Sequence, residues 1–149
     1  MKKKFKQFPL GVWISLIALL LIFFAWLMQA YSLINWEGAV KLGVQNESFS
    51  GTEVEQTLAD VEKGIALADI IWVLPLTILA FGGILKKNLL GFVSGMMVFA
   101  ICVYFPIFYF FRDSMNYEIK LAALVLWAIP SLFGIAGLWV NRALFIRRD

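Results

Sequence analysis

Two long apolar runs joined by a short polar turn constrain this chain more than any other feature of its sequence. Residues 66–85 contain one charged side chain, Asp69, and residues 89–111 contain none. Each run is long enough to cross a bilayer as a helix, and a helix satisfies its own backbone N–H and C=O groups inside hydrocarbon. The turn between them, Lys86-Lys87-Asn88, is so short that the two helices must be antiparallel neighbours. The sequence therefore predicts a transmembrane helical hairpin.

Two further uncharged runs, residues 9–30 and 121–140, complete the predicted architecture. The 149 residues are 62% apolar and only 15% charged, more apolar than a soluble domain of this length can bury. We expect an all-α integral membrane protein, a single membrane domain over residues 1–149 that forms a four-transmembrane-helix bundle. The first run ends in bulky residues where a signal peptidase needs small ones, so we expect that span to be retained.

The one sizeable polar segment, residues 31–65, lies between the first two spans. It has a local charge balance of −4. Thr52, with Glu55 three residues later, has the form of a helix capping box. Apolar residues then recur at helical spacing: Val54, Leu58, Val61, Ile65, Ala68 and Trp72. We predict an extracytoplasmic loop with a short amphipathic helix that lies on the membrane or runs into the second span, bending at Gly64.

The positions of the basic residues predict the orientation of the chain. With four spans, nine of the 13 lysines and arginines lie on the side of the two termini. The positive-inside rule places that side in the cytoplasm. Because these residues sit at the ends of spans, the net charge of +3 reflects membrane topology rather than nucleic-acid binding. We expect a bacterial cytoplasmic (inner) membrane, with a eukaryotic membrane as the alternative.

Asp69 is the only charged residue within a predicted span, about one turn inside the outer surface. Such residues often mark ion paths or ligand sites. Arg112 ends the neighbouring span on the same side, and a structural ion pair between the two is the interpretation that we favour. Glu62 lies seven residues before Asp69, on roughly the same helix face. These two carboxylates are the only pair that we nominate for acid–base chemistry.

Glycines in the last two spans are candidates for close helix packing. Gly91 and Gly95 form a small-x-x-x-small pattern, and Gly134 and Gly137 lie on successive turns. Gly91 and Gly95 suit packing within the bundle or between two copies of the chain.

The residue types that are missing exclude several kinds of chemistry. There is no histidine, which excludes histidine-ligated haem and metal sites. The single cysteine, Cys102, excludes a dithiol redox pair. We expect no cofactor, no metal, no catalytic residues and no enzyme activity.

Two functional hypotheses remain from the sequence. The first is an accessory or interaction subunit that uses its acidic outer loop and helix faces. The alternative is a small oligomeric transporter or hydrophobic-ligand-binding bundle with Asp69 near the cavity mouth. The expected partners are the lipid bilayer and either another membrane protein or a second copy of the chain, and no nucleic acid.

Overall fold

The computed structural model describes residues 8–43, 45, 52–111 and 117–146, apart from the side chains of Glu55, Leu58, Tyr109, Glu118 and Ile119. Every regular element in these ranges is a helix. Four helices in them are long and apolar enough to span a membrane, which confirms the all-α prediction at that level. These four are Leu10–Ile34, Ala59–Leu85, Leu89–Phe108 and Lys120–Val140.

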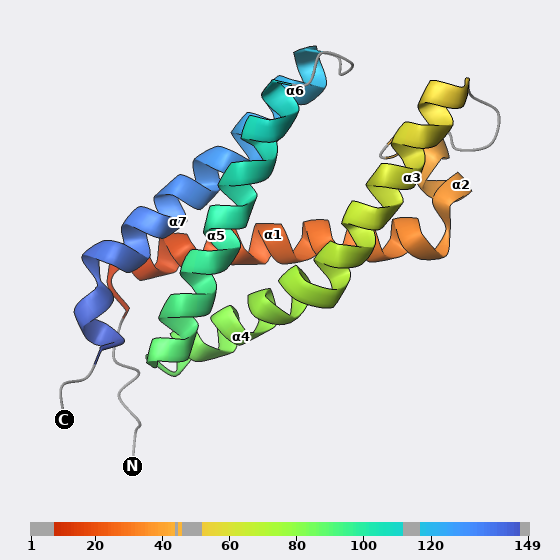
Figure 1. Cartoon of the computed structure of the whole chain (residues 1–149). Coiled ribbons are helices and arrows are strands. Elements are labelled where there is room, and N and C mark those ends of the chain that lie inside the picture. Colours follow the sequence, from red (N-terminus) through yellow and green to blue (C-terminus); the bar gives the residue numbers. More distant parts are fainter. Residues whose placement is uncertain (1–7, 44, 46–51, 112–116, 147–149) are drawn as a thin grey trace. The chain divides into compact units, whose positions relative to one another are not determined.

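The helical elements, labelled in Figure 1, belong to two compact units, which are described separately. Unit 1 comprises Met1–Ile22 and Leu76–Asp149, and unit 2 comprises Phe23–Pro75. In chain order the elements are α1 (Leu10–Ile34), α2 (Trp36–Lys41), α3 (Glu53–Ala68), η1 (Asp69–Val73), α4 (Leu74–Leu85), α5 (Leu89–Phe110), α6 (Tyr117–Ala123), η2 (Leu124–Ala128), α7 (Ile129–Val140) and η3 (Arg142–Leu144).

The polar segment before the second span contains more helix than the sequence predicts. α1 continues to Ile34, and α2 follows at once because the Asn35 side chain caps it, accepting a hydrogen bond of 3.0 Å from the Gly38 N–H. α3 begins directly after Thr52 and passes through Gly64 without interruption. The departure from α-helical hydrogen bonding comes later, at η1.

Prolines explain the two π-helical segments, η1 and η2. In each, the residue just before a proline donates its N–H five residues back, from Leu74 to the Asp69 carbonyl and from Ile129 to the Leu124 carbonyl. The following residue, Pro75 or Pro130, has no N–H, and its ring crowds the carbonyl four residues earlier. A wider turn before the proline relieves that crowding and keeps the helix continuous.

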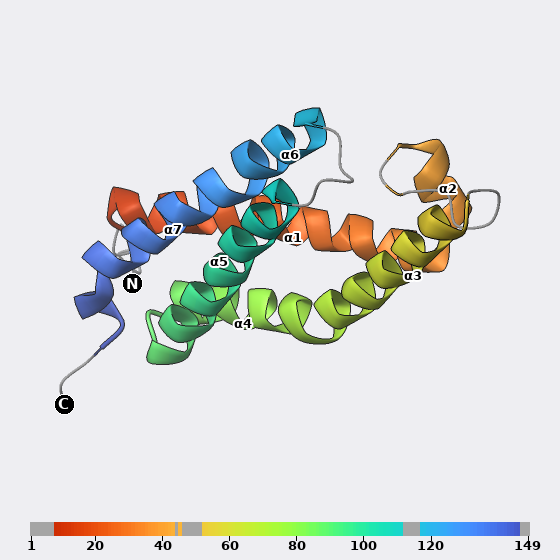
Figure 2. The same ribbon diagram turned by 45° about the horizontal axis from the view of Figure 1, so that its top comes forward.

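The packing of unit 1 depends on glycines, where helices α4, α5 and α7 come close together. Gly83 and Gly91 face each other across the α4–α5 turn so closely that a Cβ on either would overlap the other's backbone. A Cβ on Gly95 would lie 2.8 Å from Leu138 Cδ1, and one on Gly134 would overlap the Phe99 ring. α5 and α7 accordingly lie side by side in both ribbon views (Figures 1 and 2).

The start of α1 packs against the end of α7, also within unit 1. The Ser15 hydroxyl lies 2.9 Å from both the Gly11 and the Gly134 carbonyl oxygens, to which it can donate. A Cβ on Gly137 would lie 2.7 Å from the Ser15 hydroxyl oxygen. Lys87 in the α4–α5 turn places its ammonium group 4.6 Å from the centre of the Phe8 ring, just before α1. The start of α1, the end of α7 and the α4–α5 turn therefore meet at one end of unit 1.

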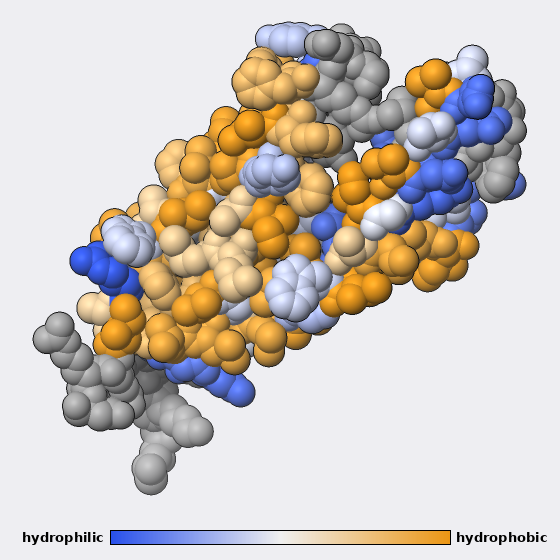
Figure 3. Space-filling model, viewed as in Figure 1, coloured by the Kyte–Doolittle hydropathy of each residue, from blue (hydrophilic) through white to orange (hydrophobic). Residues whose placement is uncertain are grey.

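Unit 2 holds the remainder of α1 together with α2, α3 and η1. α2 and α3 are in contact, because the Lys63 ammonium group lies 5.2 Å from the centre of the Trp36 ring. Buried residues of this unit include Trp26, Ala39 and Ala59. Figure 3 shows hydrophilic residues over α2 and α3, whereas the visible face over α5 and α7 is largely apolar.

Candidate functional site

Among the charged side chains that the structure describes, that of Asp69 is buried, and this residue lies within a candidate span. Its exposed fraction is 5%, and it is the first residue of η1. Ala59, Ala66 and Val73 on the same helix are also buried, and their spacing of seven, three and four residues places them with Asp69 on one face. We call these four residues the acid face. Its other members have no polar group in their side chains, so burial of this carboxylate is costly unless a polar group or ion joins it.

Within the part of the chain that the structure describes, the Asp69 carboxylate makes no hydrogen bond and no ion pair. Arg112, its expected partner, lies outside the described residues, so that pairing stays a prediction. Glu62 is half-buried on the same helix. The candidate span begins at Ala59, ten residues before Asp69, which corresponds to about 15 Å along the helix. The sequence predicts that the membrane-spanning part starts near residue 66, about one turn before Asp69. The 27-residue helix is longer than the about 20 residues that the hydrocarbon needs, so its first turns can lie outside the hydrocarbon.

The apolar stripe of α3 and η1 lies on a different face from Asp69, and that face is exposed. The exposed fractions are 68% for Val54, 51% for Val61 and 59% for Trp72. Ala68 is also exposed, and Ile65 is half-buried. We call these five residues the α3 stripe. In water, a helix buries its apolar stripe against the core. Here the acid face is covered instead, and the stripe is left for lipid or for a partner.

The glycines nominated from the sequence belong to unit 1, whereas Asp69 and Glu62 belong to unit 2. Gly91, Gly95, Gly134 and Gly137 each face a neighbouring helix at a distance that leaves no room for a side chain. Sequence reasoning missed that Asp69 begins a π-helical segment. The signal for it was Pro75, six residues later, which predicts a helix distortion at the preceding turn.

Chemical groups for metal binding are sparse in the described residues, where no cluster of three or more His, Cys, Asp or Glu side chains is present. The four helices that are long and apolar enough to span a membrane indicate the class, an all-helical integral membrane protein. In comparisons with protein families, with curated proteins and with solved structures, nothing matches this chain.

Proposed function

We propose that this protein is an accessory subunit of a membrane-protein complex. It binds its partner through the α3 stripe and the segment between α1 and α3. The observation that supports this most directly is the exposure of the α3 stripe. Exposed apolar residues that form a continuous row commonly mark an interaction surface.

Lipid covers only part of that stripe. A helix needs about 20 residues to cross the hydrocarbon, whereas the candidate span Ala59–Leu85 has 27. Its first five residues include Asp60 and Lys63, a partly exposed ion pair with 3.6 Å between the charged atoms, which belongs at the polar interface. Val54 precedes the span altogether. The N-terminal part of the α3 stripe, at Val54 and Val61, therefore projects beyond the hydrocarbon, where a protein surface is the natural partner for exposed valines.

Site-specific photo-crosslinking tests this proposal on one helix, with each control position within two residues of a test position. A photoreactive residue at Val54 or Val61 is expected to give at least five times more crosslinked protein product than the same residue at Gln56 or Asp60. Gln56 and Asp60 are exposed on the other side of α3, so they serve as matched controls. Mass spectrometry of the products identifies the partner. Equal yields at all four positions, or adducts with lipid alone, would refute the proposal.

The proposed location is the cytoplasmic membrane of a bacterium, with both termini in the cytoplasm. The end of unit 1 where α1 begins and α7 ends supports this, because Lys86, Lys87 and Arg142 gather there. We expect a membrane-impermeant maleimide to label Gln45→Cys but not Lys87→Cys in intact cells. Cys102 does not interfere, since only 1% of it is exposed. Labelling of Lys87→Cys but not Gln45→Cys would show that the orientation is the opposite of the proposed one.

A second candidate function is a small oligomeric transporter or ligand-binding bundle. The observation that favours it is the burial of Asp69, because an acidic residue inside a span is a frequent functional site in membrane proteins. A bound small molecule that copurifies with the wild-type protein in mild detergent, and is lost from Asp69→Asn, would support this candidate. A protein partner that binds equally well to both forms would support the accessory subunit instead.

A further inference from the structure

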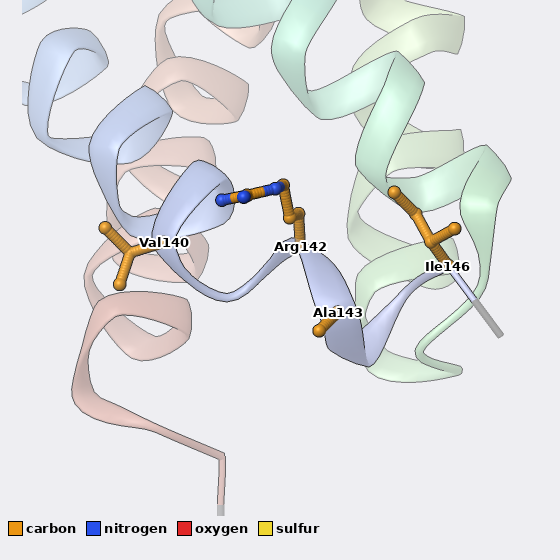
Figure 4. Close-up of a pocket in the computed structure, with 4 residues that line it drawn as sticks. All are labelled: Val140, Arg142, Ala143 and Ile146. Atoms are coloured by element: carbon orange, nitrogen blue, oxygen red, sulfur yellow. The ribbon is translucent and has the colours of Figure 1, made fainter. Parts of the chain in front are cut away.

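Among the described residues, a surface hollow beside the end of α7 combines an arginine with apolar walls. Its volume is about 500 Å³, and Val140, Arg142, Ala143 and Ile146 line it. In Figure 4 the Arg142 side chain lies between those of Val140 and Ile146. The exposed fractions of these two apolar side chains are 76% and 47%, so both are available for contact.

Contacts with Trp139 hold the Arg142 guanidinium in place. Its central carbon lies 5.1 Å from the centre of the Trp139 ring, and Nη1 donates a hydrogen bond of 3.1 Å to the Trp139 carbonyl oxygen. A guanidinium has five N–H donors in a planar fork that suits phosphate oxygens. No other partner of this group occurs among the described residues, so most of these donors are available to a ligand.

The surroundings of the hollow are those of a membrane interface. It adjoins the end of the candidate span Lys120–Val140, and Trp13 and Trp139 are exposed at the same end of unit 1. Indole rings favour the level of the lipid headgroups. Lys87, over the Phe8 ring, adds a second cation beside an aromatic ring there.

We propose that this hollow binds an anionic phospholipid. The lipid phosphate accepts hydrogen bonds from the Arg142 guanidinium, and the upper part of an acyl chain packs against Val140 and Ile146. A soluble phosphate would use the charge and leave the apolar walls in water, whereas a phospholipid at this depth covers both. The site lies in unit 1 and does not depend on the proposed partner surface of α3.

The test is lipid binding to the purified, delipidated full-length protein, measured by native mass spectrometry with phosphatidylglycerol and phosphatidylcholine of the same acyl chains. The wild-type protein is expected to bind the first lipid at least fivefold more tightly. Arg142→Gln is expected to lose that preference, and Arg142→Lys to keep part of it. Glycerol phosphate, which has the headgroup charge without the chains, is expected not to compete.

Lys86→Gln is the matched control, because it removes the same charge from the same end of unit 1 without touching the hollow. It is expected to change the lipid preference less than twofold. An equal loss in both variants would mean that the preference is a general charge effect, and it would overturn the site. The absence of any preference in the wild-type protein would overturn it as well, and so would competition by glycerol phosphate at the same concentration.

Discussion

Replacing Gly83 by alanine is expected to destabilise the protein by about 3 kcal/mol, because the added methyl group has no space. A Cβ at this position would overlap the Gly91 Cα and lie 2.8 Å from Asn88 Oδ1. Backbone atoms cannot move away by a rotamer change, so α4 and α5 would have to separate. The free energy of unfolding in mixed detergent and SDS micelles measures this loss.

The neighbouring residue supplies the control. A Cβ on Gly82 would meet no atom within 4 Å, so Gly82→Ala is expected to leave stability unchanged or to raise it by about 0.5 to 1 kcal/mol, through better helix propensity. The same methyl group added one residue apart then gives opposite results. Similar effects of the two substitutions would show that α4 and α5 are not in close contact at Gly83.

Substitutions of Asp69 are expected to have the second large effect on stability, mainly through the charge of the side chain. Asp69→Lys is expected to lower the free energy of unfolding by about 3 kcal/mol, because it places a larger cation at a position with an exposed fraction of 5%. If Asp69 is paired with Arg112 as predicted, Asp69→Asn keeps the size of the side chain but leaves the arginine without its charged partner, and the expected loss is about 1 to 2 kcal/mol. The same detergent unfolding measurement applies to both variants.

The predicted ion pair with Arg112 is tested by a double-mutant cycle with Asp69→Asn and Arg112→Gln. If the two side chains are paired, the double variant loses less stability than the sum of the two single variants. Additive losses would contradict the pairing. In that case the buried carboxylate of Asp69 has no structural partner in Arg112, and the ligand-binding candidate gains support.

The sequence alone determined the four long apolar helices and indicated the membrane class, because continuous apolar runs of about 20 residues have few other stable forms. It also identified Gly91, Gly95, Gly134 and Gly137 as candidates for close packing, since small residues in apolar helices commonly lie at helix contacts. These inferences depend on local composition and spacing, which are properties of the chain before it folds.

Only the tertiary structure decided which side of each helix is covered. Periodicity grouped Val54, Val61 and Trp72 on one face, but it does not say whether that face is turned toward the core. The structure covers Asp69 and exposes those three residues. It also brings Gly11 to Gly137 and Gly95 to Leu138, contacts between residues far apart in the chain. Such choices depend on how neighbouring helices fit together, and no segment of the sequence carries that information by itself.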